Sequence, residues 1–236
     1  MPTRRKVRKP VSRTRKKSGG INLPVLCLFI GIAAVVLGIG YMQYKKYLRK
    51  KYFKTIGMEQ YENGLQAVTI NYGSQIQFNA NSHDVSTEFL YALCMLECGG
   101  ARKILPRFEP HVYKRLIRLK NGEIKDYEGI TTEQMRLFSD KTIKNMASSW
   151  GPLQVMGYHS IHINISLNEF IGDSVVKHSV HWIDKEYGHL LKNQRFQDAF
   201  HRHNAGTNYP LLGPPKTHDP QYVNKGLQFM EYYFSF

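Results

Sequence analysis

The pattern of apolar and polar positions divides the chain into one uncharged run and a longer body with helical periodicity. The run covers Leu23–Met42 and contains 20 residues without a charge. About 20 apolar residues are enough to cross a bilayer as a helix. We therefore expect residues 23–42 to form one transmembrane helix, preceded by a basic cytoplasmic tail over residues 1–22.

Apolar residues at helical spacing dominate the second half of the body. The residues that mark one face of a long helix are Val175, Val176, Ser179, Val180, Ile183, Tyr187, Leu190 and Leu191. A following helix stops at Asn204-Ala205-Gly206. Capping boxes begin at Thr131 and Ser166, and Asp219-Pro220 is typical of a helix start. The pattern predicts a mainly α protein, either all-α or α+β with helices dominant.

The segment between the apolar run and this helical body is less regular. We expect residues 43–80 to be a juxtamembrane linker or lead-in, with Tyr61–Asn81 extended, irregular or folded as a short hairpin. Ser82 or Asp84 would then cap a helix that runs to Cys98. Residues 148–157 are expected to form a loop with a Gly-Pro break. On this interpretation the folded domain occupies residues 81–236.

Charge is concentrated at the N-terminal end of the chain. The formal net charge is +15, yet nine Lys and Arg lie in Arg4–Lys17 and six in Lys45–Lys54, before the first acidic residue. The rest of the chain has 18 basic and 18 acidic side chains. The cations flank the apolar run instead of covering a folded face, so they indicate membrane topology and contact with anionic lipid. No nucleic-acid partner is expected.

The same charges predict how the apolar run lies in the membrane. Nine cations precede it and six follow, so the positive-inside rule places the N-terminus in the cytoplasm and the body outside. The alternative is a cleaved signal peptide, because Gly38-Ile39-Gly40 is a small-x-small site. The length of the run favours an uncleaved anchor.

One carboxylate stands out in the body. Glu97 ends the apolar stretch Tyr91–Cys98 and is followed by Gly99-Gly100, a helix C-cap signal. The negative end of the helix dipole and desolvation both disfavour the ionised form of such a group. A carboxyl that keeps its proton near neutral pH is what a glycosidase needs as its general acid. On these residues alone a surface glutamate in a final helical turn is favoured.

Segments further along the chain change that balance. Three pieces follow one another in order, Glu97-Cys98-Gly99-Gly100, Trp150–Gly157 and His203–Gly206. Together they resemble the lysozyme-like superfamily that includes lytic transglycosylases and goose-type lysozymes. The segment Ile104–Tyr113 is similar to one in the N-acetylmuramidase domain of phage endolysins. The resemblance covers roughly Thr87 to the C-terminus and implies a lysozyme-like fold.

The resemblance also implies roles for individual residues. Glu97 takes the position of the catalytic general acid. Glu109 and His111 fall in the family's Phe-Glu-x-His element, as candidates for a second carboxylate or a supporting role. The positions that line the sugar groove correspond to Gly151, Leu153, Gln154, His203 and Asn204.

The chain departs from the family pattern at three of these places. Cys98 stands where Ser is usual, and Pro152 replaces a Leu in the Gly-Leu-Met-Gln-type loop. His203 stands where a tyrosine usually reaches the catalytic Glu. A charged histidine there would lower the pKa of Glu97. This last departure is the main support for a rival interpretation, a non-catalytic peptidoglycan-binding or envelope-assembly module that uses the same groove.

Histidines and cysteines suggest no cofactor. His159-x-x-His162 and His178-x-x-His181 have spacings compatible with a shared ion, but no His-Glu-x-x-His pattern accompanies them. We expect surface or core histidines and no metal. Three cysteines do not make a disulfide framework, and Cys94 and Cys98 are expected to be small buried side chains.

The resulting hypothesis is a peptidoglycan-cleaving enzyme on a single-pass anchor in the bacterial inner membrane, with its domain on the periplasmic side. Its substrate would be the glycan strands, cut at the MurNAc-GlcNAc β-1,4 bond. If a second carboxylate such as Glu109 or Asp126 activates water, the enzyme is an N-acetylmuramidase. Without one, the family precedent is a lytic transglycosylase. An envelope-spanning secretion or conjugation complex is a candidate partner for such local wall remodelling.

Overall fold

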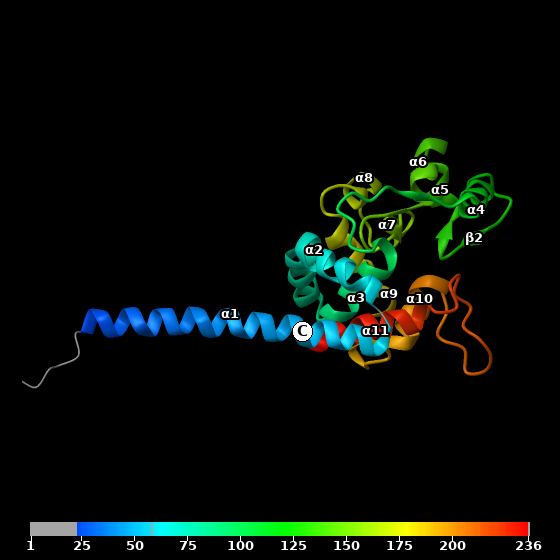
Figure 1. Cartoon of the computed structure of the whole chain (residues 1–236). Helices are drawn as coiled ribbons and strands as arrows, with labels where there is room; N and C mark the ends of the chain where they lie inside the picture. The colour runs from blue at the N-terminus through cyan, green and yellow to red at the C-terminus, as the bar shows by residue number, and fades with distance from the viewer. Residues whose placement is uncertain (1–22, 58, 236) are drawn as a thin grey trace, which may run out of the picture. The chain divides into compact units, whose positions relative to one another are not determined.

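The computed structural model describes residues 23–57 and 59–235 (Figure 1). The expected basic tail over residues 1–22 lies outside them. The described residues form two compact units, divided between Lys51 and Tyr52.

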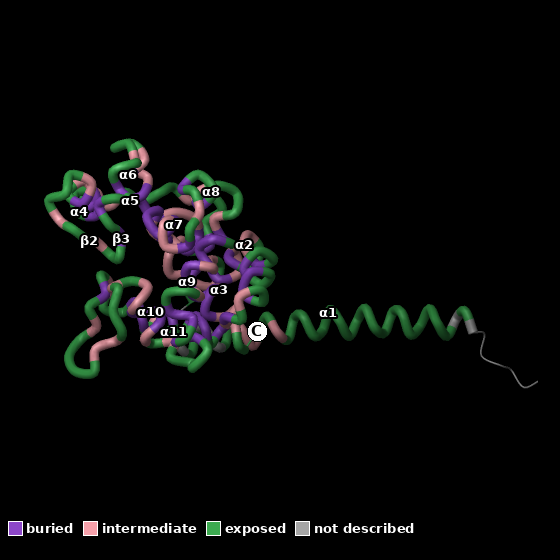
Figure 2. Tube along the Cα trace, turned by 180° about the vertical axis from the view of Figure 1, so that it is seen from behind, coloured by how far each residue is buried: buried purple, intermediate pink, exposed green. Residues whose placement is uncertain are grey.

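The N-terminal unit is dominated by helix α1, which covers Leu23–Ile56 and has 34 residues. Over Leu26–Lys51 this helix is long and apolar enough to span a membrane. Its described side chains are mostly exposed (Figure 2). The helix continues past Met42 through the basic segment to Ile56, where the sequence analysis expected a linker.

The second unit is mainly helical. Its helices are the 3-10 helix η1 (Glu59–Tyr61), α2 (Glu62–His83), α3 (Thr87–Cys98), α4 (Pro110–Lys120), α5 (Thr132–Arg136), α6 (Asp140–Met146), α7 (His159–His162), α8 (Leu167–Ile171), α9 (Val175–Lys192), α10 (Phe196–Ala205) and α11 (Tyr222–Ser235). Its short strands are β1 (Arg107–Phe108), β2 (Asp126–Tyr127), β3 (Ile130–Thr131), β4 (Ser148–Trp150) and β5 (Val155–Met156). They form an antiparallel sheet of order β1-β4-β5 and a β2-β3 hairpin.

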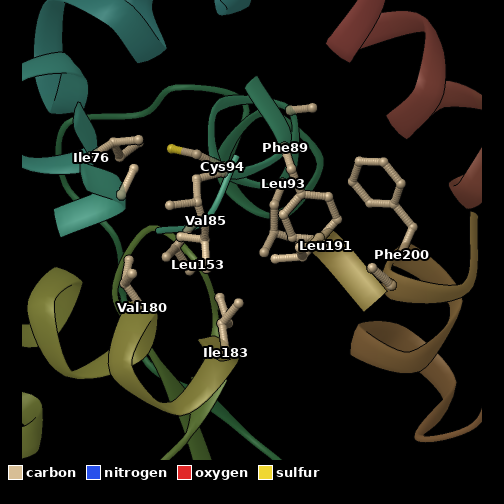
Figure 3. Packing of buried hydrophobic residues seen from close by; sticks show 14 of the residues in the cluster. Ile76, Val85, Phe89, Leu93, Cys94, Leu153, Val180, Ile183, Leu191 and Phe200 are labelled. Carbon is tan, nitrogen blue, oxygen red and sulfur yellow. The ribbon is translucent and has the colours of Figure 1, made fainter. Parts of the chain in front are cut away.

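A large hydrophobic core joins α2, α3, α9, α10 and α11. At its centre the Phe89 ring lies 4.5 Å from that of Phe200 and packs edge-on against Tyr187, and all three residues are fully buried. Figure 3 shows Phe89 and Phe200 facing each other, with Leu93 beside them. Burying each large apolar side chain contributes about 1.5–3 kcal/mol, so this cluster fixes where the end of α3 lies.

A smaller core lies under α4, α5 and α6. It contains Leu116, Leu119, Ile130 and Met135, all fully buried, and Tyr158 packs against it. In Figure 1 these helices and β2 gather at one end of the unit. The unit therefore has two hydrophobic clusters.

Helix α2 corrects the expectation that Tyr61–Asn81 is extended or irregular. The segment is helical, and its buried side chains Leu65, Val68, Ile76 and Ala80 belong to the large core. Its glycines and β-branched residues are poor helix formers, but packing of one apolar face outweighs propensity. The compact unit consequently begins at Tyr52, upstream of the boundary expected at residue 81.

Helix α3 follows after a short turn, and its start also differs from expectation. Asp84 adopts the left-handed conformation and ends α2, so neither it nor Ser82 can cap α3. Ser86 is the cap, because its Oγ accepts a hydrogen bond from the backbone N–H of Phe89. At the other end Gly99 has φ +60° and confirms the predicted glycine C-cap after Cys98.

Other local predictions are confirmed or shifted by a few residues. The capping box at Thr131 is present, and Ser166 caps α8. Helices α9 and α10 follow the predicted apolar faces, and α10 ends at Gly206 in the left-handed conformation. The terminal helix begins at Tyr222, two residues beyond Pro220. Residues 148–157 form the β4–β5 hairpin where a loop was expected.

The glycine pair after α3 gives a test of how closely α2 approaches. A Cβ on Gly100 would lie 2.6 Å from the carbonyl oxygen of Gly64, whereas a Cβ on Gly99 would meet nothing within 4 Å. Both glycines have positive φ, so either alanine costs about 1–2 kcal/mol of backbone strain. We expect Gly100→Ala to lose a further ~1–3 kcal/mol through overpacking. Thermal unfolding of the full-length protein in detergent measures this, and equal melting temperatures for the two variants would contradict the close approach.

Candidate active site

Glu97 lies in the last turn of α3, where the chain turns away through two glycines. Only 9% of its side chain is exposed, because the apolar faces of α3 and α11 enclose it. Burial raises the pKa of the Glu97 carboxyl above its ordinary value, since a charge is poorly solvated there. The residue is therefore a partly enclosed carboxyl, and the alternative of a surface glutamate does not apply.

A tyrosine that sequence reasoning missed holds this carboxyl. The Tyr222 hydroxyl donates a hydrogen bond of 2.5 Å to Oε1 of Glu97. Tyr222 is buried in the first turn of α11, 125 residues further along the chain. The bond favours the ionised form and so lowers the pKa of Glu97, but less than burial raises it. The Asp219-Pro220 signal indicated that a helix starts nearby, but no local pattern could indicate this long-range contact.

His203 lies on the other side of the carboxyl, on α10. Its Nε2 is 3.8 Å from Oε1 of Glu97, and its Nδ1 lies 2.7 Å from the hydroxyl of Tyr187. Burial lowers the pKa of His203 to about 4, so the ring is neutral at neutral pH. His203, which stands where the resembled families have a tyrosine, therefore does not place a cation beside Glu97. Tyr222 supplies a tyrosine contact to the glutamate from a different helix.

The β4–β5 hairpin carries three of the residues expected to line the sugar groove, Gly151, Leu153 and Gln154. Gln154 has φ +47°, and its side chain closes the turn by accepting a hydrogen bond of 2.7 Å from Ser149 Oγ and donating one of 2.9 Å to the carbonyl of Gly151. Gln154 lines the cavity described below, whereas Gly151 and the fully buried Leu153 do not. Gly151 packs against Val175, and the backbone of Leu153 hydrogen-bonds His203.

Asn204 reaches the same cavity from the end of α10. Its Oδ1 accepts a hydrogen bond of 3.1 Å from the backbone N–H of His218, which holds the irregular segment 207–221. Both Asn204 and His218 line the cavity. The structure thus brings Asn204, Gln154 and His203 to the same cavity as Glu97. The side-chain amides of Asn204 and Gln154 also form hydrogen bonds that hold the local backbone.

Glu109 and His111 lie at the start of α4 and also line the cavity. Glu109 forms an ion pair with Arg107, with 2.9 Å between Oε1 and Nε, and its Oε2 is 3.7 Å from Nδ1 of His111. Asp126, the other candidate second carboxylate, lies exposed on β2 and does not line the cavity.

These residues surround one cavity of about 1200 Å³, whose walls include side chains that pack on both hydrophobic clusters. Carboxylates missed by sequence reasoning are Glu128 on the β2–β3 turn, Glu186 on α9 and Asp219. The aromatic residues of the wall are Tyr61, Tyr127, Tyr158, Trp182, Tyr222 and Phe229. The cavity is somewhat larger than most sites for one small molecule, which are usually about 300–1,000 Å³.

The histidine pairs with metal-compatible spacing make other contacts. Nδ1 of His159 lies 2.9 Å from Nδ1 of His162, and the His159 ring stacks on Trp182. Nε2 of His162 lies 2.8 Å from the carbonyl oxygen of Glu128. In the described part of the chain no cluster of three or more His, Cys, Asp or Glu residues could hold a metal ion.

The two cysteines that flank Glu97 are free thiols on one helix. Cys94 is buried and Cys98 half-buried, with their sulfurs 3.7 Å apart. Cys98 Sγ is hydrogen-bonded to the backbone of Gly100 and Ala101. The prediction of a buried side chain is therefore confirmed for Cys94, whereas Cys98 at the end of α3 is partly exposed.

No protein-family model, curated protein or solved structure matches the chain. The site is therefore interpreted from its own geometry and from the resemblance of its short motifs.

The buried carboxyl predicts a pH-dependent difference in stability. The folded-state pKa of Glu97 is raised, so wild-type stability falls as pH rises from the ordinary value of about 4.3 through the raised pKa. Glutamine cannot ionise, and its Oε1 can still accept the Tyr222 hydroxyl. We expect Glu97→Gln to melt above wild type at alkaline pH, with the difference closing below about pH 4. Melting curves of the full-length protein across this range test it.

Glu109→Gln is the matched control for this comparison. It removes a carboxylate from an ion pair with Arg107 instead of from an apolar environment, so it should not raise the melting temperature in the alkaline range. A Glu97→Gln variant that is less stable than wild type at every pH would show that the carboxylate is well solvated or compensated in the fold.

Proposed function

We propose that this chain is a membrane-anchored glycosidase that cuts the MurNAc-GlcNAc β-1,4 bond of peptidoglycan with Glu97 as general acid. The observation that carries the proposal is a buried carboxyl at the wall of a cavity of about 1200 Å³. Because burial raises its pKa, Glu97 keeps a proton to a higher pH than an exposed glutamate. A general acid must hold its proton at the working pH.

The surroundings of Glu97 suit both halves of such a reaction. Glu97 gives its proton to the glycosidic oxygen while the bond to C1 breaks and positive charge builds on the sugar. The carboxylate that remains keeps its hydrogen bond from Tyr222 and lies in the field of Arg107, and both interactions favour the ionised form. It can then accept a proton from the incoming nucleophile, which is either water or the C6 hydroxyl of the same sugar.

The distribution of the other carboxylates favours the second route. Among the described residues of the cavity wall, Glu109, Glu186 and Asp219 are each paired with a cation: Arg107, Arg202 and Lys225. The pKa of Glu97 responds to burial, Tyr222 and Arg107 and not to a second carboxylate. We therefore favour a lytic transglycosylase, in which C6–O attacks C1 and Glu97 takes the hydroxyl proton. If water is the nucleophile, Glu128 is the carboxylate without a cation partner at this wall.

The apolar helix α1 gives the proposal its setting. We propose that residues 23–42 anchor the chain in the bacterial inner membrane with the N-terminus in the cytoplasm and the second unit in the periplasm. A tethered enzyme reaches only the wall near its anchor. Local opening of the glycan, as around an envelope-spanning secretion or conjugation complex, fits this restriction better than bulk lysis.

The first test is the loss of the acidic proton. Glu97→Gln is nearly isosteric, and general acid catalysis contributes about 10²–10⁴-fold, so we expect glycan cleavage to fall by at least this factor. The assay incubates full-length protein in detergent with purified peptidoglycan and determines the sugar ends by mass spectrometry. Anhydro ends identify a transglycosylase and reducing ends a hydrolase.

Two outcomes would overturn the assignment. Cleavage by Glu97→Gln at the wild-type rate would exclude Glu97 as the acid. If wild type and variant both leave the glycan uncut but bind it equally, the chain is a peptidoglycan-binding module.

The second test concerns the hydrogen bond from Tyr222. Tyr222→Phe keeps the buried ring but removes the donor that favours ionised Glu97, so the pKa of Glu97 should rise further. We expect the alkaline limb of the pH–rate profile to move upward by about 1–2 pH units. Tyr233→Phe is the control, because it removes a hydroxyl from the same helix, α11, that donates to the backbone carbonyl of Leu65 on α2 instead of to Glu97. An unmoved limb in Tyr222→Phe would mean that Tyr222 does not act on the acid.

A further inference from the structure

We propose that Arg107 forms a carboxylate-binding subsite on the wall of the cavity that contains Glu97, and that it selects glycan strands that carry acidic substituents. The inference rests on the proposed function for its substrate, and it assigns the basis of substrate choice to one residue. Arg107 lines the same cavity as Glu97, and 65% of its side chain is exposed, so a ligand can reach it.

The short sheet fixes the backbone of Arg107 against the hairpin that carries Gln154. Arg107 in β1 is directly opposite Ser149 in β4, and Ser149 Oγ holds the Gln154 side chain. Two residues further along the chain, the backbone N–H of Glu109 donates a hydrogen bond to the carbonyl of Ala147. Strand pairing and the Glu109–Ala147 hydrogen bond therefore fix the backbone of Arg107. The neighbouring hairpin carries Gln154, which lines the same cavity wall.

The contacts of the guanidinium leave its binding groups available. Nε donates to Oε1 of Glu109 at 2.9 Å, and the other oxygen of Glu109 is 3.7 Å from His111. This uses one of the five N–H donors of an arginine, while the two terminal nitrogens carry the other four. A planar guanidinium fork held from one side is the group that binds a carboxylate through two parallel hydrogen bonds.

The charge of Arg107 also reaches the centre of the site. It lowers the pKa of Glu97 and of His203, and it acts on Tyr222, the other buried partner of the acid. Burial of those three groups is the larger effect in each case, but Arg107 is the one cation common to them. A carboxylate bound to Arg107 would thus lie in the same cavity as the reacting bond.

Four other Lys and Arg residues line the wall. Lys216 is exposed there but carries an ammonium without the planar fork of an arginine. The other three are engaged by partners. Arg202 contacts Glu186 through both Nε and Nη2, and its Nη1 contacts Asn208. Lys225 pairs with Asp219, and Lys185 donates to the carbonyl of His162. None of these three is among the groups that shift the pKa of Glu97.

The proposed substrate has acidic groups where this subsite requires them. The sugar whose C1 is attacked carries a lactyl ether at C3 of the same ring. Its carboxyl is either free, in glycan without peptides, or amide-linked to a peptide that has carboxylates of its own. Chitin oligomers have the same backbone and linkage but no carboxylate. A cation in the cavity that contains Glu97 would distinguish the two polymers by charge.

The experiment measures binding to Glu97→Gln in the full-length, detergent-solubilised protein, so that no probe is cleaved. Calorimetry compares three soluble oligosaccharides of equal length: a chitin oligomer, a peptide-free glycan with free lactyl carboxylates, and a peptide-bearing glycan. Adding Arg107→Ala should weaken binding of a carboxylate-bearing probe about ten- to a hundredfold and leave chitin binding unchanged. Unchanged chitin binding also shows that the variant is folded.

Two further variants sharpen this result. Arg118→Ala is the control, because Arg118 also pairs an exposed guanidinium Nε with a glutamate, Glu123, but lies outside the cavity wall. It should leave all three affinities unchanged. Arg107→Lys keeps the charge without the fork and should recover only part of the lost affinity.

Each outcome has a defined meaning. Loss with the peptide-free glycan identifies the lactyl carboxylate as the ligand, and loss only with the peptide-bearing glycan identifies the peptide. Equal loss for chitin and acidic probes, or no loss for any, overturns the subsite. If the parent protein never cuts peptidoglycan but Arg107→Ala still weakens acidic glycan binding selectively, the proposed catalysis fails and the subsite stands.

Discussion

The enclosure of Glu97 between α3 and α11 is the constraint on which the site depends. The carboxyl could not be buried by α3 alone, because it lies in the last turn of a helix that ends one residue later, at Cys98. Helix α11 closes it off, and ring contacts position this helix: the Phe229 ring lies 5.2 Å from that of Tyr61, and the Tyr233 ring lies 4.9 Å from that of Tyr91 on α3. Packing of the C-terminal helix therefore sets the electrostatics of a residue near the middle of the chain.

Local signals in the sequence predicted a good part of this arrangement. The glycines after Glu97 ended the helix as expected, and the apolar faces of α9 and α10 placed His203 and Asn204 on a helix end. These features depend on neighbouring residues, so a pattern of a few positions records them. The same reasoning placed Glu97, Gln154 and Asn204 at one cavity only through the resemblance, because nothing local joins segments 50 or more residues apart.

The features that the sequence did not predict are contacts between distant segments and a helix that forms against its helix propensity. Helix α2 has two glycines and several β-branched residues, and it is stable because Leu65, Val68 and Ile76 pack on α3 and α9. Tyr222 occupies the position of a core residue in its own helix, and only the fold shows that its hydroxyl meets Glu97. The pairing of β1 with β4, which sets Arg107 beside the hairpin, joins strands about 40 residues apart. Each of these contacts follows from packing that single-residue preferences do not encode.

The balance of forces on Glu97 also bears on the choice between enzyme and binding module. Burying an ionisable group costs stability at every pH where the unfolded chain would ionise it. A glutamine would fill the same space and accept the same bond from Tyr222 without this cost. Sugar recognition alone would be met by such a neutral amide. Burial raises the pKa of Glu97, while the hydrogen bond from Tyr222 and the charge of Arg107 lower it. Such opposing effects on one enclosed carboxyl are typical of groups that exchange protons, and this favours the catalytic proposal.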